Sequence, residues 1–185
     1  MTSINVVLIR HAEKPDGRRH ETGIDGYGRD DPHSLSRRGW QRAKELPVFF
    51  TVVGTTSPLL PIPDRIFASA FRPGGGHSRR PEQTVQPLSE TLHCPVDLRW
   101  SLHQERELGA VLASLEGTSL VCWQHQGLAA LAKAIVAPQS LPALQEWPAD
   151  CYDGIWWLHR DSPGEWWRMA SYRMIGIEGF LAIVR

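Results

Sequence analysis

The sequence has few cysteines, no long apolar run and no excess of one charge. The three cysteines, Cys94, Cys122 and Cys151, are odd in number and form no CxxC pair, so we expect neither a disulfide framework nor a cysteine-based zinc site. No apolar run approaches the roughly 20 residues that a membrane-spanning helix needs, and no membrane association is expected. Lys and Arg together number 20, as do Asp and Glu, so the formal net charge is zero. A nucleic-acid-binding protein is typically basic, and no nucleic-acid partner is expected here.

The N-terminal segment, MTSINVVLIRHAEKP, lacks the basic stretch, the long apolar core and the small-residue cleavage site of a secretory signal. Together with the scattered cysteines, this predicts a cytoplasmic protein with reduced thiols. The chain has 185 residues, of which 42% are hydrophobic and 22% are charged, a balance typical of globular proteins. No linker or repeat interrupts it, so we predict one domain over residues 1–185. The sequence does not indicate an oligomeric state.

Apolar patterns predict strands that alternate with helices. Strands are expected at residues 4–10, 65–69 and 119–124, with a late pair at 154–159 and 166–173. Helices are expected after the N-cap Ser36, from Pro81 onward, along the apolar stripe at 108–115, and at 127–136. Pro47 is expected to kink or end its helix. This alternation predicts an α/β three-layer sandwich, in which a mostly parallel central sheet has helices on both faces. The late pair is expected to be antiparallel or at an edge.

Two histidines follow predicted strands directly. His11 comes after the first strand, and His125 follows the strand at 119–124. In open α/β sheets a ligand binds outside the carboxyl ends of the strands, so both histidines are candidate site residues. Arg10 ends a buried strand, where a guanidinium is costly unless it faces an anion or an acid. None of the histidines has HExxH or His-x-His spacing, so no metal site is predicted.

The segment VLIRHAEK, residues 7–14, resembles the signature of the histidine phosphatase superfamily, the phosphoglycerate-mutase-like proteins. Three further segments resemble motifs of that family in the same order. They are LSRRGWQRA at 35–43, IFAS at 66–69 followed by SRRPEQT at 78–84, and LVCWQH at 120–125. The similarity extends from near residue 6 to about residue 160. Each motif alone has low specificity, but four of them in order indicate this family and its fold.

The resemblance implies that His11 is phosphorylated during turnover, and that Arg10, Arg80 and His125 hold the phosphoryl group. Arg80 is selected by counting back from Thr84, with Arg79 as the alternative. Two features depart from the family pattern. Proline stands at position 81, where the family usually has alanine, although proline is acceptable in the first turn of a helix. An insert at 73–76 separates Ser69 from the arginine.

The resemblance also implies a carboxylic acid that protonates the leaving group, and the sequence offers several. Glu105 and Glu107 both stand at the edge of an apolar helical stripe, so periodicity does not distinguish them, and both could simply favour a helix N-terminus. Glu105 is preferred as the proton donor by a small margin, and Glu13 is a third candidate. Gln126 follows the second histidine, where the phytase-like branch of the family has an aspartate, and this argues against an acid phosphatase.

The expected activity is hydrolysis of a small phosphorylated substrate, a phosphomonoester, without a cofactor or metal. Two alternatives stay open, a phosphomutase of the same family and a non-catalytic module that binds a phosphorylated ligand on this fold. The segment from Lys14 to Asp31, which contains Arg18, Arg19, His20 and Arg29, is either a solvated loop or a lip over the phosphate site that contacts acidic groups of the substrate.

Overall fold

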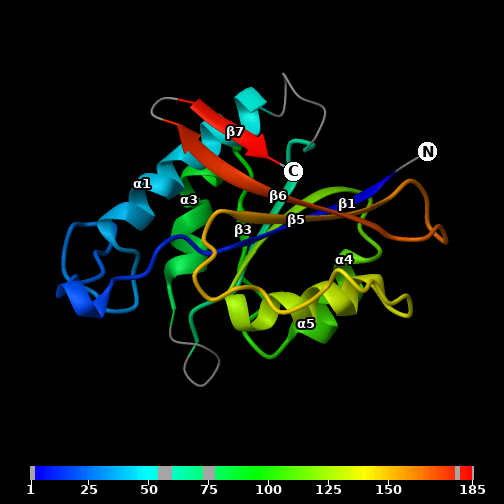
Figure 1. Ribbon diagram of the computed structural model, residues 1–185, viewed down its shortest axis with the longest axis horizontal. Coiled ribbons are helices and arrows are strands. Elements are labelled where there is room, and N and C mark those ends of the chain that lie inside the picture. Colours follow the sequence, from blue (N-terminus) through cyan, green and yellow to red (C-terminus); the bar gives the residue numbers. More distant parts are fainter. Residues whose placement is uncertain (1–2, 54–59, 73–77, 178–179, 185) are drawn as a thin grey trace.

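The computed structural model describes residues 3–53, 60–72, 78–177 and 180–184, and within them it contains one seven-stranded sheet (Figure 1). The strands are β1 (Ile4–Arg10), β2 (Arg65–Ala68), β3 (Val96–Asp97), β4 (Gly117–Trp123), β5 (Gly154–Arg160), β6 (Arg168–Ile177) and β7 (Phe180–Val184). The α-helices are α1 (Arg37–Val48), α3 (Arg80–Leu92), α4 (Glu105–Leu112) and α5 (His125–Val136). A short 3-10 helix, η1 (Gly17–Arg19), lies between β1 and α1, and a π-helical segment, η2 (Phe49–Val53), follows α1.

The strand order is β3-β2-β4-β1-β5-β6-β7, which places β1 in the middle of the sheet. The first four strands pair in parallel, whereas β5, β6 and β7 form antiparallel pairs. Five of the seven described strands therefore run in one direction, and the predicted mostly parallel sheet is confirmed. The late pair is antiparallel as expected, but β6 is not an edge strand because β7 pairs with it.

Helices cover both faces of the sheet, with α1 and α3 on one face and α4 and α5 on the other (Figure 1). Each face buries its own apolar cluster. Leu46 of α1 and Leu88 of α3 pack with the odd-numbered side chains of β1, such as Ile9. Leu108 of α4 and Leu128 of α5 pack with the even-numbered ones. The side chains of β1 are apolar on both faces of the sheet, so the strand can be buried between two helical layers. This explains why its sequence is a continuous apolar run.

The predicted N-cap of α1 is present, and Pro47 lies close to the end of the same helix. The side chain of Ser36 caps α1 by accepting a hydrogen bond from the backbone N–H of Gly39 at 3.1 Å. Pro47 lies inside α1, which continues to Val48 and passes into η2. Pro47 was predicted to kink or end its helix, and α1 ends one residue beyond it, where the wider π-helical turn begins at Phe49. α5 begins at His125, two residues earlier than predicted.

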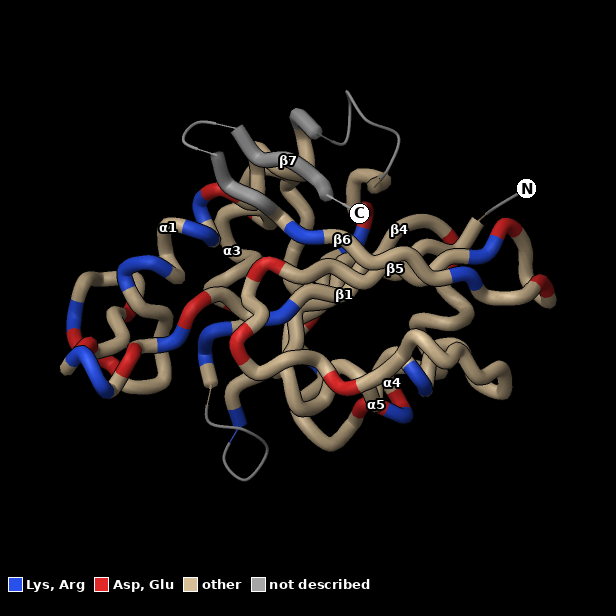
Figure 2. The backbone as a smooth tube through the Cα atoms, viewed as in Figure 1, with Lys and Arg blue, Asp and Glu red and all other residues tan. Residues whose placement is uncertain are grey.

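Charged residues of both signs gather on the segment between β1 and α1, and the strands carry few of them (Figure 2). This segment connects the carboxyl end of β1 to α1 and contains η1. It therefore stands beside the end of the sheet at which His11 lies. No helix in the described ranges is both long and apolar enough to cross a membrane.

Candidate active site

Adjacent parallel strands bring the two predicted histidines to the same end of the sheet. β1 and β4 pair in register, with Arg10 opposite Trp123, and the backbone N–H of His11 donates to the carbonyl of Trp123 at 3.1 Å. His125 is the first residue of the helix that follows β4. The two imidazoles therefore emerge from neighbouring chain segments at the carboxyl ends of parallel strands, where the fold favours a ligand.

His11 is a buried neutral imidazole, with only 4% of its surface exposed. Its pKa is lowered to about 3, first by burial and then by the positive charges of Arg10, Arg80 and His125. The Nδ1 atom lies 2.7 Å from the carbonyl oxygen of Ala12. A carbonyl oxygen can only accept, so Nδ1 carries the proton and Nε2 keeps its lone pair. This is the tautomer that a nucleophilic histidine requires.

Arg10 ends β1 and is almost completely buried, with 2% of its surface exposed. One guanidinium nitrogen donates to the carbonyl oxygen of Ala149 at 2.5 Å, and the ring of Tyr152 lies over the guanidinium at 3.8 Å from the ring centroid. The Nε atom has no hydrogen-bond partner in the described part of the chain. Burial lowers the pKa of Arg10, but an arginine stays protonated in proteins. The site thus holds a buried cation with an unused donor.

Arg80 is the second arginine that the structure brings to His11. Its Nε donates to the carbonyl of Ser34 at 2.9 Å, and a terminal nitrogen donates to the carbonyl of Pro32 at 2.5 Å. Burial lowers its pKa, and its charge is one of those that lower the pKa of His11. Arg79 instead pairs with Asp31 at 3.7 Å, and half of its side chain is exposed. These contacts favour Arg80 over Arg79.

Thr84 ties the two arginine-bearing segments together. Its hydroxyl accepts from the backbone N–H of Ala12 at 2.8 Å and donates to the carbonyl of Arg80 at 2.7 Å. The residue after His11 is thereby joined to the first turn of α3. The predicted insert at 73–76 lies outside the described part of the chain.

Among the candidate acids, Glu105 lies nearest the end of β4. Its Oε1 accepts from the indole Nε1 of Trp123 at 2.9 Å and from the backbone N–H of His103 at 3.2 Å. A methyl group at Gly127, in the first turn of α5, would lie 2.4 Å from the same oxygen. Both hydrogen bonds fall on one oxygen, so Oε2 has no hydrogen bond within the described residues. Glu107 is exposed, with no such tether.

Glu13, the third candidate, is committed to an ion pair. Arg42 binds its carboxylate through two nitrogens, at distances of 2.6 to 3.1 Å, and Arg38 lies 3.4 Å away. Guanidinium donors of Arg42 therefore occupy both oxygens of the Glu13 carboxylate. The geometry therefore favours Glu105 over Glu13.

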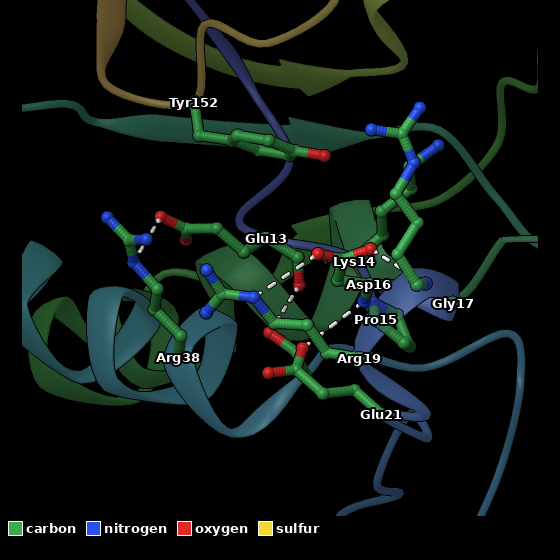
Figure 3. Close-up of a pocket in the computed structure, with 11 residues that line it drawn as sticks. Glu13, Lys14, Pro15, Asp16, Gly17, Arg19, Glu21, Arg38 and Tyr152 are labelled. Atoms are coloured by element: carbon green, nitrogen blue, oxygen red, sulfur yellow. Dashed lines mark hydrogen bonds and ion pairs between the residues drawn. The ribbon is translucent and has the colours of Figure 1, made fainter.

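Tyr152 was not among the site residues predicted from the sequence. It lies in the connection between α5 and β5, and its ring centroid is 6.1 Å from that of His11. On its other side it lines a cavity of about 590 Å³ with the segment 13–21. Figure 3 shows Tyr152 along one side of this cavity, with Arg19 and Glu21 on the opposite side. Tyr152 thus separates the cavity from the buried Arg10 and His11.

Within the residues that the structure describes, no group of three or more His, Cys, Asp or Glu side chains is arranged to hold a metal ion. The residues gathered at the end of the sheet are instead cations and a neutral imidazole, which suit an anion. A phosphoryl group has oxygens that the forked donors of two arginines can bind, and its phosphorus can accept the Nε2 lone pair.

The chain resembles several solved structures. A phosphoglycerate mutase from Plasmodium falciparum is 12% identical, with a TM-score of 0.55, and the match covers 92% of this chain and 90% of that one. The protein histidine phosphatase SixA, solved in complex with tungstate, is 17% identical, with a TM-score of 0.50 and coverage of 84% and 87%. YhfR of Bacillus stearothermophilus is 14% identical, with a TM-score of 0.50 and coverage of 90% and 95%. Neither the protein-family models nor the curated proteins include a match.

Proposed function

The chain has the fold of the histidine phosphatase superfamily, and from this premise we propose that it is a phosphatase that hydrolyses a phosphomonoester through a phosphohistidine on His11. The observation that carries the proposal is the state of His11. It is neutral, its Nε2 has the lone pair, and the charges of Arg10, Arg80 and His125 act on it.

In the first step, Nε2 of His11 attacks phosphorus, and the bond from phosphorus to the leaving oxygen breaks. Arg10 and Arg80 hold the non-bridging oxygens, and His125 donates a hydrogen bond to them. Donors already in place before the reaction stabilise the developing charge without reorganisation. The Nδ1–H of His11, bonded to the carbonyl of Ala12, stabilises the positive charge that the ring acquires.

The leaving oxygen takes a proton from a carboxylic acid, and Glu105 is the proposed donor. In the second step, water attacks the phosphohistidine, its proton returns to the same carboxylate, and the phosphorus–nitrogen bond breaks. Phosphate leaves and His11 is again neutral. Two donors fix Oε1 of Glu105, and this supports the role because it leaves Oε2 available for the proton.

The primary test is phosphate release from an aryl phosphate in the presence of EDTA. We expect turnover by the wild type and none by His11→Ala. Equal turnover by both proteins would overturn the assignment of His11. No turnover by the wild type, on this and a panel of other phosphomonoesters, would favour a module that binds a phosphorylated ligand without reaction.

A pair of variants tests the acid. Glu105→Gln should slow hydrolysis of an alkyl phosphate by about 10²- to 10⁴-fold, because an alkoxide leaves only when protonated. It should have little effect on the release of nitrophenolate from a nitrophenyl phosphate in the first turnover, because this leaving group is stable as an anion and needs no proton. Glu107→Gln is the matched control, because it makes the same replacement of one carboxylate oxygen by an amide nitrogen on the same helix, and it should leave both rates unchanged. A larger effect of Glu107→Gln would reassign the proton donor.

A further inference from the structure

The cavity beside Tyr152 is the space next to the phosphoryl site in which the rest of a substrate would lie. Tyr152 lines it on one side and contacts Arg10 on the other, with the guanidinium 3.8 Å from the ring centroid. Its volume of about 590 Å³ is in the range of small-molecule sites, roughly 300 to 1,000 Å³. Because Tyr152 contacts Arg10 and also lines the cavity, the leaving group of a phosphomonoester held at His11 would extend past this ring into the cavity.

Cations line the cavity, and two of them have no counter-charge. In the described part of the chain, neither the ammonium of Lys14 nor the guanidinium of Arg18 makes an ion pair or a side-chain hydrogen bond. The lining also contains Glu21, whose carboxylate accepts from the backbone N–H of Asp16 at 3.2 Å, so the two unpaired cations outnumber the one carboxylate without an ion pair. Arg19 pairs with Asp16 at 3.5 Å, and Glu13 is already neutralised by Arg42.

Lys14 also connects the cavity with the proposed catalytic residues. After burial, the charges of Arg10 and Lys14 are what lower the pKa of His125. Lys14 therefore lines the cavity and is also close enough to His125 for its charge to act on that ring. An anion bound at Lys14 would be part of the same molecule as the phosphoryl group.

The balance of charge is reversed in a neighbouring cavity. A neighbouring cavity of about 240 Å³ shares Pro15, Gly17 and Glu21 with it, but there the other charged residues are Asp30, Asp31 and Arg80. Its carboxylates would repel an anion. Since the chain as a whole has no net charge, the unpaired cations of the larger cavity form a local feature that selects for negative charge.

We infer that the substrate is a small phosphomonoester whose leaving group carries a second anionic group, bound in this cavity by Lys14 and Arg18. The inference rests on the proposed function, because it assumes that the phosphoryl group binds at His11. It names the class of substrate that the proposed phosphatase would take and excludes a neutral or cationic leaving group as the preferred one.

The test is equilibrium binding of two phosphonates that cannot be hydrolysed, 4-carboxybenzylphosphonate and its 4-carbamoyl analogue, measured by calorimetry. The two probes have nearly the same shape and differ in one charge. The wild type should bind the carboxylate about three- to tenfold more tightly, as expected for one or two partly exposed ion pairs. Lys14→Gln and Arg18→Gln should each reduce this ratio toward one. Arg37→Gln should not, since Arg37 is equally exposed but does not line the cavity.

Equal affinity for the two probes, failure of both to bind, or a ratio that survives in Lys14→Gln and Arg18→Gln would overturn the inference. Turnover of an aryl phosphate is a separate readout. Turnover with equal affinity for the probes would overturn the inference and keep the phosphatase. A preference for the carboxylate that depends on Lys14 and Arg18, in a protein without turnover, would support the cavity and overturn the phosphatase.

Discussion

Protonation of His11 should destabilise the folded protein, and the size of the effect follows from the burial of the ring. The pKa of His11 is about 3 in the folded protein, against an ordinary value of about 6.5 that the unfolded chain restores. Between these two values the unfolded state binds a proton on His11 and the folded state does not. The free energy of unfolding therefore falls as the pH falls through this window, and the loss is complete only below the lower value.

The magnitude can be worked out for a convenient interval. From pH 7 to about pH 4.5, these two pKa values lower the free energy of unfolding by about 2.5 kcal/mol. Other titrating groups add their own dependence, so the wild type is compared with His11→Asn, which keeps a polar side chain but cannot be protonated. Urea unfolding of both proteins, at both pH values, isolates the contribution of the imidazole.

The wild type should lose about 2.5 kcal/mol more than His11→Asn over this interval. Circular dichroism at neutral pH verifies that the variant is folded before the comparison is made. An equal loss in the two proteins would refute the reasoning, because it would mean that the His11 ring takes up a proton as easily in the folded protein as in the unfolded chain.

Two further predictions concern stability. Thr84→Val removes the acceptor of the backbone N–H of Ala12 and should lower the free energy of unfolding by about 1 to 3 kcal/mol, whereas Thr84→Ser should keep most of this stability. Urea unfolding at neutral pH measures both variants. An unchanged free energy of unfolding in Thr84→Val would contradict the importance of this bond. Gly109→Ala would place a methyl group 2.5 Å from the Cβ of Ala134 and should cost about 1 to 3 kcal/mol. The double variant Gly109→Ala/Ala134→Gly should recover part of that loss, and strict additivity would argue against close contact between α4 and α5.

The elements that position the chemistry could be predicted because their signals are local. The apolar run of β1 requires burial on both faces. His11 comes directly after this run, and the fold class places a ligand site at the carboxyl ends of the strands. Ser36 is a short polar residue before an apolar helical stripe, and it caps α1 as expected. Arg80 was selected as the second arginine by counting back from Thr84 in the segment that resembles the family motif. The contacts of its guanidinium favour the same residue.

The parts that the sequence left open depend on contacts between distant segments. Tyr152 reaches His11 only because the connection after α5 returns to the end of β1, and its own sequence neighbourhood carries no sign of this. The choice between Glu105 and Glu107 depends on the indole of Trp123, which comes from a different element. Pro47 was expected to kink or end its helix, because proline has no backbone N–H to donate. The chain instead continues into a wider turn, in which the hydroxyl of Thr51 donates to the carbonyl of Pro47 at 2.7 Å.

The central place of β1 has a consequence for how this protein could diverge. Arg10 is the last residue of β1, the strand in the middle of the sheet, and His11 follows it directly. Both side chains are buried, so a substitution there disturbs the packing at the end of the sheet. Lys14 and Arg18 stand on an external segment, where a replaced side chain leaves the packing intact. For the proposed phosphatase, mutation can therefore change the preferred leaving group without threatening folding, whereas the proposed phosphoryl chemistry depends on the integrity of the sheet. New substrate ranges should be reached through the segment between β1 and α1, while the reaction itself stays the same.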